Sequence, residues 1–264
     1  LATHRYRLRF SDLDLEGLRP PLRDLQGDLR LEMTGTGSEL RATGDATLGQ
    51  ILIGPVLLDH VRCPLSVYPS QGSPVLDLGS PPFPLETGLA GGMVKGNVRL
   101  RMTPEGIQGS LQAQGFDIDV GRMAAQVYPG SRPVGGNLRF DLDLTRGAEG
   151  PGGTGTFKIL DGDLGRIPTL QGVIKRLLGD EKLDKERIRR LEGAFKLEPN
   201  KILFEQILAG GKNLALIGVK NECKIRYGGE IDFLFYAGTR SELVRKLFGP
   251  LVASAWRKLT SVFT

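Results

Sequence analysis

The sequence has few of the residues on which most enzyme chemistry depends. Its 264 residues include two histidines, His4 and His60, and two cysteines, Cys63 and Cys223. His60 and Cys63 lack a second pair of ligands at zinc-site spacing, and whether the two cysteines pair stays open. No nucleophile elbow, HExxH, phosphate loop or dinucleotide fingerprint occurs. We therefore expect no enzyme, no cofactor and no metal; a hydrolase would need His4 or His60 beside a buried carboxylate.

Long hydrophobic runs and clusters of positive charge are also missing. The longest uncharged run near the end, Leu247–Trp256, has ten residues and is broken by Gly249 and Pro250. A membrane-spanning helix needs roughly 20 apolar residues, so we expect neither a membrane span nor a signal peptide within this sequence. The first residue is not Met, so we expect a processed form or a fragment. Net charge is +5, but the basic residues alternate with apolar ones and no nucleic-acid motif occurs, so we expect no nucleic-acid partner.

Glycine is abundant instead, with 37 residues, and it occurs within a repeated pattern. Four segments share the order apolar-x-Gly-x-apolar-basic-apolar, in which the residue after the glycine is Asp, Asn or Ala. A period of two places the apolar residues and the glycine on one face of a strand. A strand glycine at a repeated place indicates a bend or a close approach. The segments are Leu25–Leu31, Val94–Leu100, Val134–Phe140 and Leu191–Leu197.

These repeats predict a mainly β fold: a long, curved antiparallel sheet, either groove-like or a half-open barrel or sandwich. We expect an amphipathic sheet body over residues 1–150 and further strands with helices over 151–264, together forming one continuous sheet. The Pro-rich stretches 68–84 and 129–133 are expected to be loops, and 146–153 a flexible connection. The pattern does not decide between a closed core and an open apolar face, although closed folds are the commoner all-β architecture.

The second half also predicts two or three amphipathic helices. Apolar residues at helical spacing indicate one helix at about 168–178, and a second at about 240–263. The second could pack on the core, cover an end of the sheet, or bind a membrane surface or a protein partner. Its expected contact residues are Leu247, Phe248, Leu251 and Trp256, with Arg245, Lys246, Arg257 and Lys258 supplying positive charge.

The stretch GTFKILDGDLGRIP, residues 155–168, followed by a leucine-rich segment, resembles the C-terminal region of AsmA-like proteins. In that family a Gly-x-Phe-x-Ile-x-x-Gly strand and turn lead to an Ile-Pro-x-Leu helix, a charged spacer and further strands. The resemblance implies a relation to bridge-like lipid transfer proteins, with a periplasmic β groove in the bacterial cell envelope. It also implies an inner-membrane tether, which would lie in a segment absent from this chain.

From these patterns and this resemblance we expect a non-enzymatic module that binds or conducts acyl chains along an apolar β groove. Phospholipid transport and outer-membrane biogenesis would be its setting, with a phospholipid or other acyl lipid and an envelope protein or membrane surface as partners. The alternative is a structural or assembly protein with a closed β core. The expected lining residues are Leu29, Leu31, Val98, Leu100, Leu138, Phe140, Leu142, Phe157, Ile159, Phe195, Leu197, Phe233 and Phe235.

Overall fold

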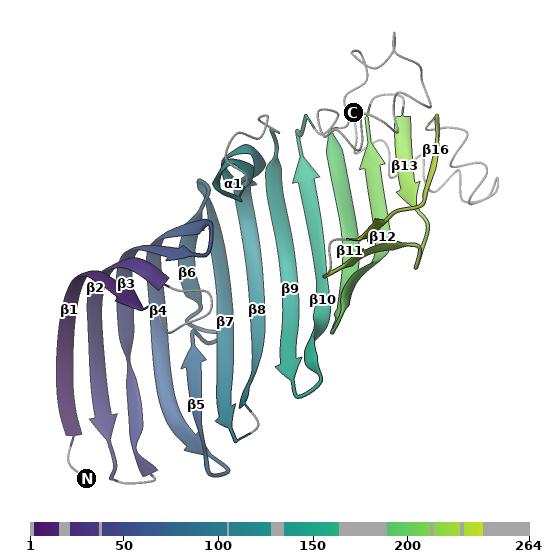
Figure 1. Ribbon diagram of the computed structural model, residues 1–264. Coiled ribbons are helices and arrows are strands. Elements are labelled where there is room, and N and C mark those ends of the chain that lie inside the picture. Colours follow the sequence, from purple (N-terminus) through teal and green to yellow (C-terminus); the bar gives the residue numbers. More distant parts are fainter. Residues whose placement is uncertain are drawn as a thin grey trace.

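The computed structural model shows one large antiparallel sheet that forms a single layer (Figure 1). It describes residues 3–15, 22–36, 39–104, 106–127, 135–163, 189–211, 214–227 and 230–239. The strands are β1 (Thr3–Leu15), β2 (Leu22–Thr34), β3 (Arg41–Ile53), β4 (Val56–Ser70), β5 (Ser73–Leu78), β6 (Leu85–Leu89), β7 (Gly92–Thr103), β8 (Gly106–Asp119), β9 (Asn137–Gly147), β10 (Gly150–Leu160), β11 (Arg190–Glu198), β12 (Lys201–Gly210), β13 (Leu214–Gly218), β14 (Cys223–Arg226), β15 (Ile231–Asp232) and β16 (Phe235–Thr239).

From β1 to β13 the strand order follows the chain, with β6 off this path, and β16 then pairs with β13. At two places in the sheet, two short strands together occupy the position of one longer strand. β5 and β6 both lie between β4 and β7, and β13 and β14 pair with opposite ends of β12. The order passes from β9 to β10, and therefore across residue 150, without a break. The prediction of a mainly β chain with one large antiparallel sheet is confirmed.

Tight two-residue turns join many of the strands. At Gln71-Gly72 both residues have positive φ, 51° and 75°, as the hairpin turn that matches strand twist requires. The expected loop over 68–84 is therefore wrong in part, because its proline signals were misleading: Pro69 and Pro74 face each other beside this turn. The expected flexible connection over 146–153 is also wrong, since the sequence there forms a hairpin in which Gly147 pairs with Gly150.

One helix is found among the described residues, α1 (Val120–Val127), where the sequence predicted two or three in the C-terminal half. The predicted helices at 168–178 and 240–263, and the expected loop at 129–133, lie outside the described residues. α1 follows β8 directly, and the Asp119 carboxylate accepts a hydrogen bond from Arg122 N at 3.0 Å, which caps its first turn. Leu57 N donates to Gln126 Oε1 at 3.3 Å, which ties α1 to β4.

The buried side chains of the described residues gather in small local clusters. One is formed by Ile51, Val61 and Cys63, with Phe10 and Leu85 among the side chains packed against it. A second forms around Ile118 beneath α1, where Met123 packs. In Figure 1 the strands β1 to β4 curl over at one end of the sheet, in keeping with a cluster that joins Phe10 of β1 to Leu85 of β6. The core is therefore local, and most of the sheet outside these clusters has no second layer of described strands.

Candidate functional site

The candidate site is the apolar face of the sheet, which the strand register defines directly. Residues paired across neighbouring antiparallel strands lie on the same face. One row of such pairs crosses twelve strands, and each member is apolar or glycine. The row is Tyr6, Leu31, Gly44, Leu65, Leu78, Val98, Leu111, Leu144, Gly153, Leu197, Ile202 and Ile225.

We call these twelve residues the apolar row. Neighbouring strands lie about 4.8 Å apart, so the row runs for roughly 50 Å along the sheet. None of its members is buried, and Tyr6 at the β1 end is 49% exposed. Strand β9 shows the same condition locally: its residues alternate between exposed and half-buried, and the half-buried ones include Leu142 and Leu144. An apolar surface this long is more than a monomeric soluble protein normally leaves exposed.

Aromatic rings lie over glycines of the neighbouring strands on this face. A Cβ on Gly115 would come within 2.3 Å of the Phe140 ring, and one on Gly193 within 2.8 Å of the Phe157 ring. In the same way, a Cβ on Gly155 would meet the Phe195 ring at 2.5 Å. The glycines therefore make room for the rings to lie flat across the sheet. Among the repeat glycines, Gly193 makes this close approach to a ring, whereas a Cβ on Gly27 or Gly96 would meet a backbone oxygen of the neighbouring strand, at 2.3 and 2.5 Å.

The rings continue into an aromatic cluster at the C-terminal end of the sheet. Phe204 lies 6.3 Å from Phe157, 6.1 Å from Phe195 and 5.6 Å from Phe233, measured between ring centroids. Phe233 in turn lies 5.7 Å from Phe235. These separations are within the range of favourable aromatic pairs. Phe233 remains 40% exposed, so the cluster offers ring surface to an apolar ligand.

The opposite face of the sheet is charged, and its charges are paired between strands. Arg99 Nε lies 2.7 Å from Asp77 Oδ1, Lys95 Nζ lies 2.6 Å from Glu86 Oε1, and Arg139 Nη2 lies 2.8 Å from Asp117 Oδ1. The hydrogen bond from Arg99 lowers the pKa of Asp77, and the one from Lys95 lowers the pKa of Glu86. This face therefore stays charged and hydrated at neutral pH.

Two shallow hollows also occur in the sheet, of about 430 and 560 Å³. Most of the side chains that line them belong to the charged rows. The first includes Arg139, Lys158 and Glu192, and the second includes Arg7, Arg30 and Asp45. Phe140 and Phe157 also line the first hollow and Tyr6 and Leu65 the second, so both hollows mix charged with apolar side chains.

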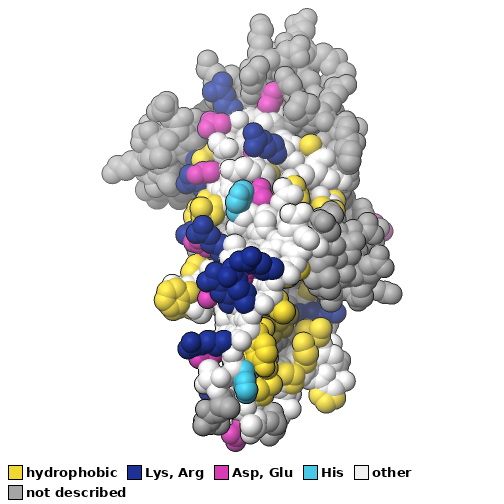
Figure 2. Space-filling view, turned by 90° about the vertical axis from the view of Figure 1, so that its left-hand side faces the viewer, with side chains coloured by type: hydrophobic (Ala, Val, Ile, Leu, Met, Phe, Trp, Pro, Cys, Tyr) yellow, Lys and Arg dark blue, Asp and Glu magenta, His cyan; other side chains and the backbone are white. Residues whose placement is uncertain are grey.

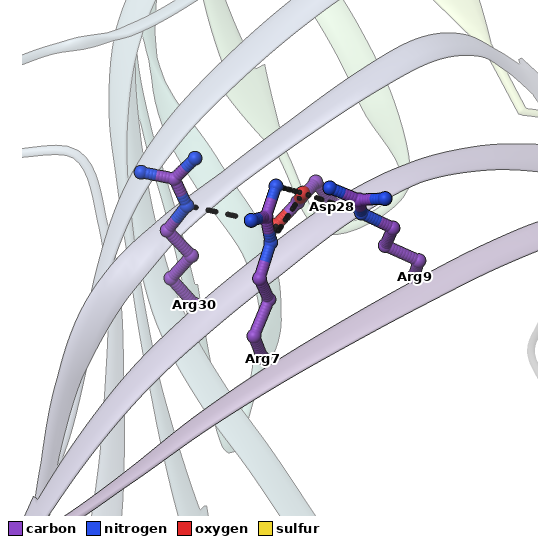
Figure 3. Close-up of polar contacts among 4 residues, drawn as sticks. All are labelled: Arg7, Arg9, Asp28 and Arg30. Carbon is purple, nitrogen blue, oxygen red and sulfur yellow. Dashed lines mark hydrogen bonds and ion pairs between the residues drawn. The ribbon is translucent and has the colours of Figure 1, made fainter.

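Charge is least balanced on the outer face of β1 and β2. Asp28 is shared by three guanidinium groups: Arg7 donates hydrogen bonds to it, and Arg9 and Arg30 lie 3.4 and 3.7 Å from it (Figure 3). The hydrogen bond from Arg7 lowers the pKa of Asp28. Seen from the β1 side, basic side chains form a group at the middle of the view, with hydrophobic side chains gathered beside it (Figure 2).

The register places the predicted lining residues together. Those in β2, β7, β9, β10 and β11 share the face of the apolar row, and Leu31, Val98 and Leu197 belong to the row itself. Phe233 and Phe235 join them through the aromatic cluster. The predicted contact residues of the C-terminal helix, from Arg245 to Lys258, lie outside the described residues. That any of these side chains binds lipid stays a prediction.

Sequence reasoning missed residues of the same face in strands it did not recognise. Leu65 and Leu78 belong to β4 and β5, which the sequence analysis did not assign as strands. Phe204 of β12 was also left out of the predicted lining, although its ring lies 6.1 Å from that of Phe195. The signal for Leu65 and Leu78 is their apolar alternation with Pro64, Ser66 and Asp77, which the prolines of this region obscured.

The histidines form no catalytic arrangement where the structure describes them. The His60 side chain is 91% exposed and its Nδ1 lies 3.1 Å from Asp59 Oδ1, which is itself exposed. Within the described residues no group of His, Cys, Asp and Glu is placed to hold a metal ion, and no helix is long and apolar enough to cross a membrane. Cys63 and Cys223 are both free and buried, so they do not pair.

Fold and site together define a class: a single-layer β protein with one apolar face and one charged face. Comparison with known proteins adds no nearer relation. No protein-family model, no curated protein and no solved structure matches the chain significantly.

Proposed function

We propose that this chain is a non-enzymatic module that holds or conducts lipid acyl chains along its apolar face, which would serve as an open groove. The observation that carries the proposal is the apolar row, which is uninterrupted over twelve strands and contains no buried member. An acyl chain laid on such a surface is removed from water at roughly 0.8 kcal/mol per CH₂. The charged opposite face would keep the complex hydrated.

The geometry favours extended apolar ligands over compact ones. A small apolar molecule would need an enclosed pocket that buries most of its surface, whereas these two hollows are shallow and open and mix charged with apolar side chains. A chain-like ligand can instead follow the row from strand to strand, and the rings around Phe204 would hold one end of it. The resemblance to AsmA-like proteins gives this activity its setting: phospholipid transport in the bacterial cell envelope, on the periplasmic side.

The alternative of a structural protein with a closed β core has less support. A closed core needs either a second sheet or one sheet that closes on itself, and the described strands form one sheet whose end strands, β1 and β16, do not pair with each other. Its partner-binding element, the basic segment at 240–263, lies outside the described residues.

A matched pair of variants tests the proposal. Leu144→Lys puts a charge in the apolar row, whereas Thr145→Lys puts the same charge on the next residue of β9, on the opposite face. We expect purified protein to carry lipid in native mass spectrometry and to bind phosphatidylglycerol with a fluorescent acyl chain. Leu144→Lys should weaken this binding strongly, and Thr145→Lys should leave it unchanged. The proposal would be wrong if the purified protein carried no lipid and bound no probe, or if Leu144→Lys and Thr145→Lys changed probe binding equally.

A further inference from the structure

Strand β1 ends the sheet with one side unpaired. It is 13 residues long and pairs only with β2, and no other described strand lies against it. Long edge strands present free backbone donors and acceptors, and proteins commonly shield them with proline, bulges or inward-pointing charges. From Thr3 to Phe10 the strand has no proline and keeps a regular register with β2. This part of β1 is therefore a suitable template for another strand.

The apolar row reaches this edge without closing. Tyr6 and Leu8 of β1 are 49% and 55% exposed, and they pair with Leu31 and Leu29 of β2 on one side only. Inside the sheet, a row member such as Leu111 has apolar partners on both sides, Val98 and Leu144. An added strand would give Tyr6 and Leu8 their missing partners if it placed apolar residues opposite them.

The charged face of the same strand is also incomplete. β1 presents Arg5, Arg7 and Arg9, but β2 offers them only Asp28 and Glu32. Arg7 stands directly opposite Arg30, so two cations form a cross-strand pair, an arrangement that is unfavourable. Elsewhere on this face cations have carboxylates on the neighbouring strand, as Arg99 has Asp77. Two carboxylates therefore serve the three arginines of β1, and a strand on its open side could supply more.

We propose that the edge of β1 binds an extended segment in which acidic and apolar residues alternate. The segment would add a strand to the sheet, with its carboxylates among Arg5, Arg7 and Arg9 and its apolar side chains beside Tyr6 and Leu8. Strand addition of this kind takes affinity from main-chain hydrogen bonds and specificity from alternate side chains. The proposal does not depend on lipid binding.

A second copy of the chain fits this edge poorly. Two antiparallel β1 strands would place arginines against arginines. The other end of the sheet, β16 (Phe235–Thr239), has the sequence FYAGT and contributes no carboxylate. Neither Thr3–Phe10 of a second copy nor β16 supplies the carboxylates, so the charges favour an acidic–apolar segment at this edge.

Peptide binding tests the proposal. The probe is a fluorescent peptide of sequence TFDLDLDF, whose FDLDL core copies residues 140–144 of this chain. One control replaces each Asp by Lys. A second keeps the side chains but carries backbone N-methyl groups on alternate residues, which removes strand hydrogen bonds. We expect only the unmodified acidic peptide to raise fluorescence anisotropy and to slow amide hydrogen exchange within residues 3–10.

Charge variants complete the test. Each double variant removes two cross-strand charge pairs. Arg5→Gln with Arg9→Gln should weaken peptide binding by about two- to thirtyfold, and Arg7→Glu with Arg9→Glu, made in a separate protein, should weaken it further because it adds like-charge repulsion. Arg139→Glu, on the same face inside the sheet, should not change it. The proposal is overturned if the N-methylated peptide binds equally well, if protection falls on β16, if the chain self-associates through β1, or if anionic vesicles bind these arginines while the peptide does not.

Discussion

Replacement of Gly44 by alanine should show how closely this sheet depends on glycine inside a strand. Gly44 lies in β3 within the apolar row, opposite Leu31 and Leu65. A Cβ at this place would lie 1.9 Å from the backbone oxygen of Arg30 and 3.1 Å from the Cα of Leu31. Both are backbone atoms of β2, so no side-chain rotation can relieve the contact.

The expected magnitude follows from that distance. Real Cβ atoms essentially never lie nearer than 3.0 Å to such an atom, so β3 would have to move away from β2 by about 1.1 Å at this point. A shift of that size breaks about two neighbouring ladder hydrogen bonds, at about 0.5–1.5 kcal/mol each. Overpacking strain adds about 1–3 kcal/mol. We expect Gly44→Ala to lower the free energy of unfolding by about 2–6 kcal/mol.

Gly49 in the same strand provides the matched control. Its Cβ would meet only the Gln26 backbone oxygen, at 3.8 Å, and its φ lies outside the positive range. Gly49→Ala should therefore be neutral or stabilise the protein by up to about 1 kcal/mol, through loss of freedom in the unfolded chain. Urea unfolding followed by far-UV circular dichroism would compare the variants, and hydrogen exchange would locate the effect in β2 and β3. Equal stability of both variants, or a loss at Gly49 as large as at Gly44, would refute the packing argument.

Two further predictions concern titratable groups. The hydrogen bond from Arg99 lowers the pKa of Asp77, so the ionised carboxylate stabilises the fold at pH values above the unfolded pKa of about 3.9. This contribution is lost as the pH falls through the lower folded pKa. Asp77→Asn should therefore be less stable than wild type at pH 7 in urea unfolding, and a stability difference that persists at pH 2 would contradict this. Burial raises the pKa of Cys63 to about 11, and Cys223 is 1% exposed. Iodoacetamide at pH 8 should therefore label neither thiol until urea unfolds the chain. Rapid labelling of the folded protein, measured by mass spectrometry, would show that the packing around these cysteines opens.

The sequence alone identifies the faces of the sheet more securely than its strands. Alternation in LRFDLDL predicts the apolar side of β9, and the structure confirms that side at Leu138, Phe140 and Leu142. The period of two is a local property that each strand carries in its own residues. The face of a strand can therefore be predicted without its neighbours.

The missed elements depend on signals that conflict or that come from other strands. Pro69 and Pro74 normally argue against a strand, yet they oppose each other beside the turn between β4 and β5. Helix α1 is one short segment after a bulge at Gly115 to Ile118, where Asp117 has a φ of 53°. The sequence signals for α1 are the cap at Asp119 and the apolar residues Val120, Met123 and Val127. A helix of eight residues contains too few apolar positions to make this spacing stand out.

The pairing register between strands is harder to predict from the sequence than the face of a single strand. A slip by one residue moves a strand's whole apolar set to the other face, and bulges change the register inside a strand. The bulge between Ala194 and Phe195 pairs Phe195 with Phe204 and leaves Glu205 out of the ladder. The aromatic cluster depends on that one extra residue, so Phe204 could not be assigned to it from its own segment.

Among the described residues no second layer of strands covers the sheet, so both the apolar row and the edge at β1 are open. In a sandwich, stability comes from two inner faces that bury each other, and an unpaired edge affects only the rim. Here the local clusters around Cys63 and Ile118 bury a few side chains, while the row between them and beyond them stays half-exposed. A ligand along the row and a strand at the edge would each bury apolar surface that the fold leaves open. An added strand would also lengthen the row by one more residue at Tyr6, so occupation of the edge should extend the surface on which an acyl chain can lie.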